Sequence, residues 1–330
     1  MTHKTRDIEM KKRLLLKSIA TLTACAVPLL GWAAWPDKPI RMVVPYAAGG
    51  GADNTARVVA QQMSAALGQQ IVIDNKPGAG GVIGADNVAK AAADGYTVLY
   101  DASAFSVNPS LRKLPFDAAK DFIPVSLVAT APQILVVPAT APYKTVPEFI
   151  DYARKNPGRL SFASAGGGTG SHLAGEALNE QAKINLMHVP YKGGAPALTD
   201  VMGEQVSAYF GNVASTLSYV KSGKLRALGV SSSKRVPGLP DVPTLAESGL
   251  PGYNVVEWNG VFLPKGTPAD IVQKLGKAVQ AAVNDPAVRQ KLLQLGLEPA
   301  GTTPEAFAKF VKDETGRVSA LVRSRNIRVD

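Results

Sequence analysis

The sequence contains very little cysteine, histidine and tryptophan. Its 330 residues include one Cys, three His and three Trp. Because Cys25 lies in the amino-terminal segment, a chain cleaved after that segment has no cysteine, which excludes disulfides, thiol catalysis and cysteine metal sites. Only His172 and His188 then remain as imidazoles, and we expect neither a metal site nor a cofactor.

The sequence also lacks any block of like charges. Charged residues make up 19% of the chain, and the net charge is +10. Six of the 36 Lys/Arg and two of the 26 Asp/Glu lie in residues 1–33, which leaves 30 and 24, a net charge of +6. No run of Lys/Arg is interleaved with aromatic residues, so nucleic-acid binding is disfavoured. A mildly positive body is compatible with an anionic ligand.

Residues 1–33 have the pattern of a secretory signal peptide. Five basic residues precede Leu14, and a mostly apolar run, interrupted by Lys17, extends to Leu30. Gly31 and Ala33 have the small-x-small spacing that signal peptidase cuts, so we predict cleavage near Ala33 and a periplasmic protein. The run is too short and interrupted for a good membrane span, which leaves a membrane anchor or a buried helix as the less favoured interpretation.

Cys25 allows a second interpretation of this segment. The residues Leu22-Thr23-Ala24-Cys25 resemble a lipoprotein processing box. Apolar residues continue at 27–30, however, where a lipoprotein usually turns polar. We therefore favour Cys25 as part of the apolar run over lipid anchoring at this residue.

Short apolar runs alternate with amphipathic segments along the rest of the chain. The first half predicts strands at 40–44, 71–73 and 96–100, with helices at 55–67 and 84–92. The middle predicts strands at 160–163, 185–189, 206–210 and 225–230, with helices at 145–157, 171–181 and 195–202. This order is typical of the α/β class, with mostly parallel sheets that helices cover on both faces.

Two segments are candidates for crossings between two α/β units. They are residues 133–137 and 255–263. After the second we predict helices only, opened by Thr267-Pro268, Asp285-Pro286 and Thr303-Pro304 as pairs of N-cap and first helical residue. The simplest arrangement has residues 35–135 and 257–330 in lobe 1 and residues 136–256 in lobe 2. Two crossings then make a hinge, and a ligand cleft lies between the lobes.

Two glycine-rich loops follow predicted strands and precede predicted helices. The first spans residues 45–53 and includes Gly49 and the potential cap Asp53. The second spans residues 164–172 and adds the hydroxyls of Ser164, Thr169 and Ser171. Exposed amides at a helix N-terminus form an anion site, so the pair predicts a carboxylate held from both sides. The alternative is that both loops are tight turns without a ligand.

Three further residues are candidates for the ligand site. Tyr191 follows a predicted strand and could close over a ligand, although core and rim positions are equally common for such a tyrosine. Asn212 lies at the carboxyl end of another strand, the edge where open α/β sheets bind ligands. His172 is favoured as a structural or hydrogen-bonding residue over a metal ligand.

At these loops the sequence resembles the Bug family, the extracytoplasmic receptors of tripartite tricarboxylate transporters. The similarity covers essentially the whole chain after the signal segment. It is carried by ordered blocks, among them Trp35-Pro36-x-Lys38-Pro39-Ile40-Arg41, Gly49-Gly50-Gly51-x-Asp53, Asn75-Lys76-Pro77-Gly78-Ala79-Gly80-Gly81, Asp94-Gly95-Tyr96-Thr97, Asn108-Pro109-Ser110-Leu111, His172-Leu173-Ala174-Gly175-Glu176, His188-Val189-Pro190-Tyr191-Lys192-Gly193, Leu239-Pro240-Asp241-Val242-Pro243-Thr244 and Gly266-Thr267-Pro268.

The resemblance implies a type II periplasmic-binding-protein fold and a small organic acid as ligand. It implies a monomer that delivers its ligand to membrane permease subunits of a tripartite tricarboxylate transporter. The ligand-binding residues that it implies are Tyr46, Gly49, Asp53, Ser103, Ser164, Gly168, Thr169, Ser171, His172, Tyr191 and Asn212. Gly167 and Gly211 stand where relatives often have Asn and Asp, which makes a ligand with an amino group less expected.

Two other classes of function are alternatives. A sensory receptor would share the binding step and signal to a membrane partner instead of a permease. A secreted enzyme is disfavoured, because Gly49-x-Gly51-x-x-Asn54 lacks the third glycine of a dinucleotide fingerprint. No Gly-x-Ser-x-Gly elbow and no phosphate-binding Gly-x-x-x-x-Gly-Lys-Ser/Thr loop is present.

Overall fold

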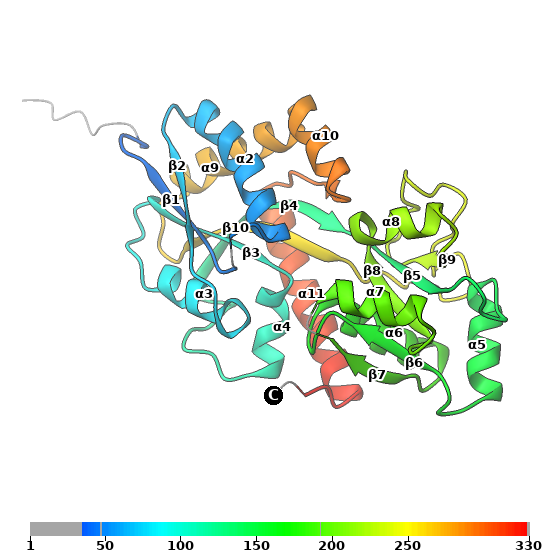
Figure 1. Ribbon diagram of the computed structural model, residues 1–330. Coiled ribbons are helices and arrows are strands. Elements are labelled where there is room, and N and C mark those ends of the chain that lie inside the picture. Colours follow the sequence, from blue (N-terminus) through cyan, green and yellow to red (C-terminus); the bar gives the residue numbers. More distant parts are fainter. Residues whose placement is uncertain (1–34, 47, 192, 329–330) are drawn as a thin grey trace, which may run out of the picture. The chain divides into compact units, whose positions relative to one another are not determined.

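Two β-sheets organise the part of the chain that the computed structural model describes, residues 35–46, 48–191 and 193–328 (Figure 1). The first sheet has the strand order β11-β4-β10-β3-β1-β2, and the second has the order β7-β6-β8-β5-β9. The predicted signal peptide lies outside the described residues. Strands of the first sheet are β1 (Ile40–Val44), β2 (Ile71–Asn75), β3 (Thr97–Ala102), β4 (Phe122–Ala131), β10 (Glu257–Pro264) and β11 (Glu298–Pro299). Those of the second are β5 (Gln133–Pro138), β6 (Ser161–Ser164), β7 (Met187–Pro190), β8 (Ala208–Asn212) and β9 (Leu225–Val230).

Helices pack against each sheet, and each sheet with its helices forms one lobe. Lobe 1 has the short 3-10 helix η1 (Ala79–Gly81) and α2 (Gly51–Leu67), α3 (Val82–Ala89), α4 (Ala104–Leu111), α9 (Ala269–Asn284), α10 (Pro286–Gln294) and α11 (Pro304–Ser324). Lobe 2 has α5 (Val146–Lys155), α6 (Gly170–Ala182), α7 (Gly194–Met202) and α8 (Val213–Lys221). Among the described residues, no helix combines the length and the apolar character needed to cross a membrane.

Both sheets are mixed, which corrects the prediction of mostly parallel sheets, although the three strands predicted in the first half of the chain are parallel to one another as expected. Strand β1 is parallel to β2 and β3, whereas β10 is antiparallel to both β3 and β4. The reason is the path of the chain: β4 leads out to lobe 2, and β10 leads back beside it. The prediction of helices only after residue 263 was also wrong, because β11 adds a short edge strand. Strand β4 and helices α4 and α8 had no counterpart in the sequence prediction.

The chain passes from the first sheet to the second between β4 and β5, and it returns between β9 and β10. Strand β4 ends at Ala131 and β5 starts at Gln133, and residues 231–256 lead from β9 back to β10. Helix α11 adds a third connection. Its Phe307 packs with Trp258 in lobe 1, whereas Val318 and Leu321 belong to the core of lobe 2 (Figure 1). The carboxyl-terminal helix therefore packs on both lobes.

Three of the predicted helix starts can be compared with their capping contacts. Asp285 Oδ1 accepts from the amides of Ala287 and Val288, at 2.9 and 3.1 Å. Thr303 Oγ1 accepts from the amide of Ala306 at 3.3 Å. Both caps confirm the prediction. Thr267 is not a cap: its hydroxyl donates to the Pro264 carbonyl, and α9 begins at Ala269.

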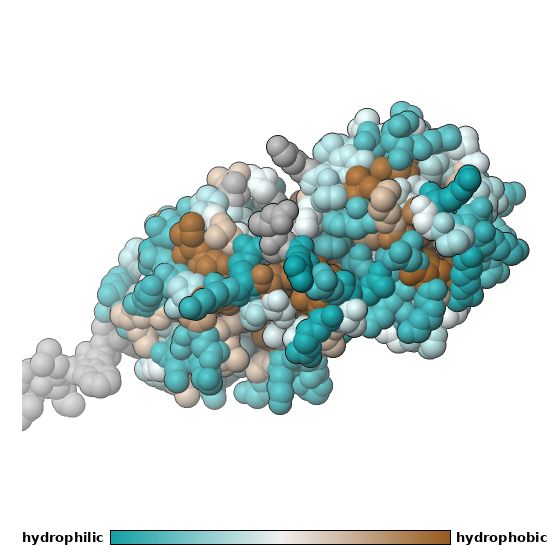
Figure 2. All heavy atoms as spheres, turned by 90° about the horizontal axis from the view of Figure 1, so that it is seen from below, coloured by the Kyte–Doolittle hydropathy of each residue, from teal (hydrophilic) through white to brown (hydrophobic). Residues whose placement is uncertain are grey.

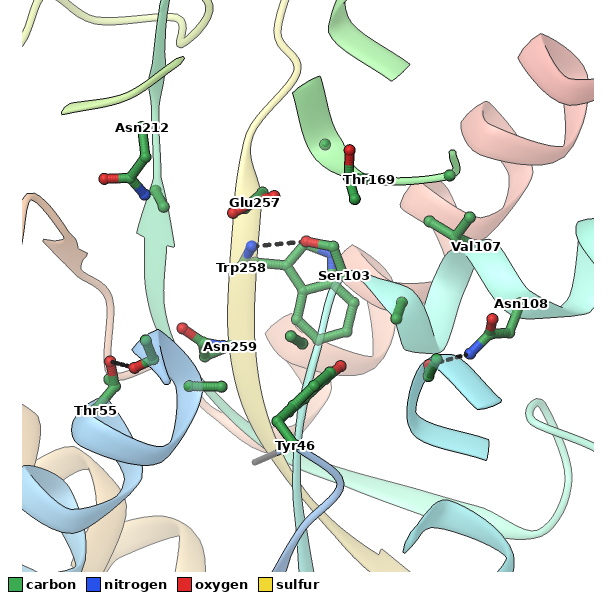
Figure 3. Close-up of a pocket in the computed structure, with 18 of the residues that line it drawn as sticks. Tyr46, Thr55, Ser103, Val107, Asn108, Thr169, Asn212, Glu257, Trp258 and Asn259 are labelled. Carbon is green, nitrogen blue, oxygen red and sulfur yellow. Dashed lines mark hydrogen bonds between the residues drawn. The ribbon is translucent and has the colours of Figure 1, made fainter. Parts of the chain in front are cut away.

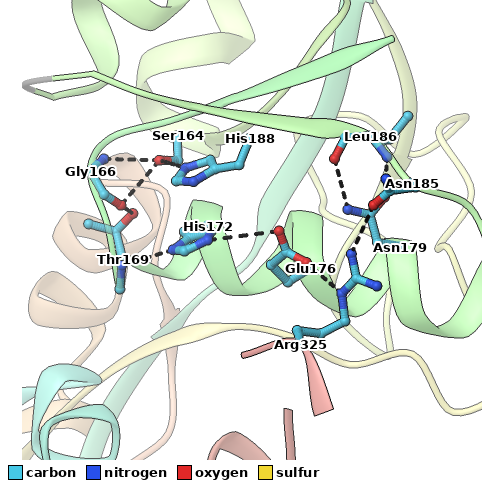
Figure 4. A network of polar contacts seen from close by, with 11 residues as sticks. Ser164, Gly166, Thr169, His172, Glu176, Asn179, Asn185, Leu186, His188 and Arg325 are labelled. Atoms are coloured by element: carbon cyan, nitrogen blue, oxygen red, sulfur yellow. Dashed lines mark hydrogen bonds and ion pairs between the residues drawn. The ribbon is translucent and has the colours of Figure 1, made fainter. Parts of the chain in front are cut away.

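A polar network connects α6 to β6, β7 and the carboxyl-terminal residues (Figure 4). The rings of His172 and His188 are stacked with centroids 3.8 Å apart, and Ser164 Oγ lies 2.6 Å from His188 Nε2. The Gly168 amide donates to His172 Nδ1 at 3.0 Å. This bond requires an unprotonated Nδ1, so neutral His172 carries its proton on Nε2, 3.9 Å from Glu176. Glu176 pairs with Arg325 at 2.7 Å.

Both histidines are held neutral. Burial lowers the pKa of His172 to about 4. Burial, with a smaller contribution from the neighbouring His172, lowers the pKa of His188 to about 4. Protonating His172 at Nδ1 would also break the hydrogen bond that holds the Gly168 amide. The network therefore stabilises the second glycine-rich loop only while the imidazoles are uncharged.

We predict that acid weakens this network. A histidine in the unfolded chain protonates near pH 6.5, whereas folded His172 resists protonation until about pH 4. Stability is then complete above about pH 6.5 and declines as the pH falls toward 4, by about 3 kcal/mol for His172. His172→Asn keeps an acceptor for Gly168 but cannot titrate. In urea unfolding, the stability difference between the two proteins should shrink from pH 7 to pH 4, and a constant difference would contradict this account.

We also predict that Gly260 cannot accept a side chain. A Cβ at this position in β10 would overlap the ring of Phe307 from α11. Gly260→Ala should therefore cost roughly 1–3 kcal/mol of unfolding free energy, as overpacking usually does. The control is Gly316→Ala in α11, where a Cβ meets nothing within 4 Å and the helix should gain up to about 1 kcal/mol. Equal effects of the two substitutions in urea unfolding would refute the argument.

Candidate functional site

A pocket of about 590 Å³ lies between the two sheets (Figure 3). This volume is within the roughly 300–1,000 Å³ that small-molecule sites occupy. Lobe 1 contributes the start of α2, the β3–α4 junction and the carboxyl end of α4, and lobe 2 contributes the loop before α6 and the start of α8. The crossing strand β10 supplies Glu257, Trp258 and Asn259. All of these are ends of elements, where open α/β folds bind ligands.

The pocket brings together five of the residues predicted from the sequence: Tyr46, Ser103, Gly168, Thr169 and Asn212. The other six do not line it: Gly49, Asp53, Ser164, Ser171, His172 and Tyr191. Ser164 and His172 belong to the polar network of Figure 4. The Tyr191 hydroxyl donates to Asp200 at 2.7 Å. These side chains form hydrogen bonds within the protein and do not line the pocket.

Asp53 fixes the first glycine-rich loop and faces away from the pocket. It is 1% exposed and accepts from the Gly49 amide at 2.8 Å, Arg57 Nε at 2.9 Å and Asn75 Nδ2 at 2.9 Å. Burial alone would raise the pKa of this carboxyl group, but the hydrogen bonds from Arg57, Gly49 and Asn75 lower it. Asp53 is thus ionised and fully used in holding the loop and the first turn of α2.

Four amides of the second loop are satisfied within the protein, whereas the amide of Gly167, which lines the pocket, has no acceptor in the described residues. Those of Ala165 and Gly166 donate to Ser171 Oγ and Ser164 Oγ, at 2.9 and 3.2 Å. Those of Gly168 and Thr169 donate to His172 Nδ1 and the Gly166 carbonyl. The Thr169 hydroxyl donates its one proton to the same carbonyl at 2.7 Å.

The N-terminus of α6 continues this pattern. The side-chain amide of Gln133 satisfies both its oxygen and its nitrogen in the orientation that places the oxygen toward α6. In that orientation the Ser171 backbone amide donates to the Gln133 oxygen at 3.2 Å. The Gly170 amide lies beside the Glu257 carboxylate and lowers its pKa against the effect of burial. Helix α6 therefore directs its first amides at acceptors that the protein itself supplies.

The first loop differs, because α2 begins with unpaired donors. Gly51 and Ala52, its first two residues, line the pocket. No acceptor among the described residues takes their amide protons. Gly51 is exposed and Ala52 is half-buried, and the start of a 17-residue helix carries a partial positive charge. The amides of Gly51 and Ala52 are therefore donors at a helix start that face the pocket without an acceptor in the described residues.

Two charged residues of the pocket wall were not found from the sequence. Arg112, just after α4, donates from Nη1 to the Ala79 carbonyl at 3.1 Å, and its buried Nε has no partner in the described part of the chain. Glu257 lies on β10, and burial raises the pKa of its carboxyl group while the Gly170 amide opposes that change. Each is an isolated charge outside any motif, so no pattern pointed to it.

Tyr46 and Ser103 line the pocket with polar groups that already have partners. The Tyr46 hydroxyl donates to Asp101 at 2.7 Å, and burial raises the pKa of that carboxyl group to about 7. Ser103 Oγ accepts from the Trp258 amide at 2.8 Å (Figure 3). Tyr46 thus presents its ring to the pocket, while Ser103 keeps a proton to donate.

Residues 55–327 match the model of the tripartite tricarboxylate transporter family receptor. Among solved structures, the periplasmic binding protein BugD is 41% identical with a TM-score of 0.72, covering 89% of this chain and 99% of its own. Rpa4515 from R. palustris with adipate is 35% identical with a TM-score of 0.75, covering 89% and 99%. MatC from Rhodopseudomonas palustris with bound malate is 35% identical with a TM-score of 0.71, covering 87% and 100%.

These similarities extend over both lobes and confirm the fold and the family predicted from the sequence. The family consists of periplasmic solute-binding receptors, and two of the similar structures hold carboxylates. The chain belongs to the receptor family of tripartite tricarboxylate transporters, together with the Bug proteins.

Proposed function

We propose that this receptor captures a small organic acid in the pocket between its lobes and delivers it to a membrane permease of the tripartite tricarboxylate type. It acts as a monomer in the periplasm, exported by residues 1–33, and leaves its ligand chemically unchanged. The bound adipate and malate of the similar structures support a carboxylate as the ligand.

The observation that carries the proposal is the pair of unpaired amides at the start of α2. A carboxylate placed there accepts from Gly51 and Ala52 and interacts favourably with the positive end of the helix dipole. Arg112 adds a positive charge to the same wall of lobe 1. The carboxylate supplies the acceptor that these donors lack among the described residues.

Binding favours closure of the lobes. We assign residues 35–135 and 257–330 to lobe 1 and residues 136–256 to lobe 2, with the β4–β5 and β9–β10 connections as the hinge. Closure brings Thr169 and Asn212 of lobe 2 against a ligand already held by α2. A ligand that contacts both lobes only when they are closed shifts the population toward that state. The end of α11, which packs in the core of lobe 2, moves with that lobe.

The pocket is suited to binding without catalysis. Ser103 and Thr169 are its candidate nucleophiles, but their hydrogen-bond partners in the described residues are a backbone amide, a carbonyl and the Ser171 hydroxyl. No histidine or carboxylate in the described residues activates either hydroxyl. A nucleophile needs such a base within hydrogen-bond reach, so this arrangement supports a receptor.

The sharpest test removes one amide proton without changing the helix. Gly51 is the first residue of α2, and the preceding Gly50 has φ −72° and ψ 168°, which suits a residue before proline. Gly51→Pro should therefore leave α2 intact. A hydrogen bond to a charged group contributes about 1.5–3 kcal/mol, so we expect at least tenfold weaker carboxylate binding. Isothermal titration measures it with a carboxylate selected by a thermal-shift screen.

The matched control is Gly51→Ala, which keeps the amide proton at a position where a Cβ meets nothing within 4 Å. This variant should bind like the natural protein. If Gly51→Pro and Gly51→Ala bind the carboxylate equally well, the amides of α2 do not hold it. If no organic acid raises the melting temperature, the protein is not a carboxylate receptor.

A further inference from the structure

We propose that Glu257 gives the pocket a negative pole, which selects a carboxylate ligand that also carries a hydrogen-bond donor, an ammonium or hydroxyl group. This inference rests on the proposed function and specifies its ligand class. One end of the ligand is the carboxylate at α2, and the other is the donor at Glu257. A ligand with a second ionised carboxylate at that end is disfavoured.

Glu257 occupies the middle of the pocket. It is the first residue of β10, and it lies on that strand with Thr169 and Asn212 of lobe 2 on either side (Figure 3). Its side chain is half-buried, and no Lys, Arg or His in the described part of the chain forms an ion pair with it. The groups around it are the Gly170 amide, the Gln133 amide group and Tyr209. The carboxylate therefore retains acceptor capacity that the protein does not use.

The glycine at position 170 leaves room for the Glu257 side chain. A Cβ at Gly170 would lie 2.5 Å from Glu257 Cγ and 2.8 Å from its Oε1. Any residue other than glycine at the start of α6 would thus push Glu257 away from the helix N-terminus. Gly170 lets the acidic side chain occupy the place that an anionic ligand would otherwise take at α6.

The charges at the two helix N-termini do not balance in the same way. A helix N-terminus is equivalent to about half a positive charge, so the full negative charge of Glu257 leaves the α6 end about half a unit negative. At α2 the carboxylate of Asp53 is paired with Arg57 at 2.9 Å. The negative charge of Asp53 is therefore balanced by Arg57, and the partial positive charge of the helix N-terminus remains at the pocket. The pocket is dipolar, with its positive pole in lobe 1 and its negative pole at β10.

A dipolar pocket discriminates between the ends of a ligand. An ammonium or hydroxyl group donates to the Glu257 carboxylate, whereas an ionised carboxylate meets a like charge and has no proton to give. The glycines at 167 and 211 made an amino group less expected from the sequence. Glu257 supplies the missing acceptor from another strand, so that expectation is reversed.

The experiment compares matched ligands on matched variants. The ligands are the dicarboxylates from malonate to adipate and the ω-amino and ω-hydroxy acids of similar length. The variants are Glu257→Gln, which keeps the shape of the side chain, and Glu180→Gln, which removes the same charge from α6 outside the pocket. Melting temperatures without ligand verify folding, and isothermal titration gives each affinity.

We expect the natural protein and Glu180→Gln to bind an amino or hydroxy acid at least tenfold more tightly than the dicarboxylate of similar length. Glu257→Gln should lose at least tenfold in affinity for the amino acid and gain affinity for the dicarboxylate. These opposite changes cannot come from a loss of folding, which would weaken both ligands.

Other results overturn the inference. If Glu257→Gln leaves the preference unchanged, or shifts both affinities by the same factor, Glu257 does not select the ligand. Continued binding of dicarboxylates would still support the proposed function in that case. If no compound of either series binds to the natural protein, the proposed function is wrong and the inference falls with it.

Discussion

The rest of the structure depends on one requirement, that a backbone N–H at the start of a helix finds an acceptor. Helices α2 and α6 both begin at the pocket, and both follow a glycine-rich loop. The first amides of α6 have acceptors from the protein, including the carboxylate of Glu257, whereas those of Gly51 and Ala52 have none in the described residues. The two helix starts therefore differ: the protein supplies acceptors at α6, whereas the proposed carboxylate would supply them at α2.

The geometry of the pocket follows from how the chain runs between the lobes. Strand β10 lies antiparallel between β3 and β4 and carries Glu257 and Trp258 into the pocket as it returns from lobe 2. The same strand packs closely on α11, where the ring of Phe307 fills the space above Gly260. Helix α11 also reaches the core of lobe 2. Strand β10 and α11 therefore contribute both to the wall of the pocket and to the packing between the lobes.

The sequence predicted the architecture better than the site, for physical reasons. Apolar periodicity located most strands and helices, because burial on one face is a local property of the sequence. The mixed first sheet was missed because strand direction depends on the path of the chain between lobes. Asp53, Ser164, Ser171 and His172 look like ligand contacts in a loop, but the structure shows their oxygen and nitrogen atoms bound to neighbouring groups. Glu257 and Arg112 could not be found, because only the tertiary fold brings these single charges to the pocket.

The central claim is that the amides of α2, and not those of α6, bind the ligand's carboxylate. Amide proton chemical shifts in an NMR titration with a bound organic acid test this most directly, because a new hydrogen bond to a carboxylate moves the donor proton downfield. The account predicts the largest downfield changes at Gly51 and Ala52. Downfield changes at Gly168, Thr169 and Gly170, with Gly51 and Ala52 unmoved, would contradict it.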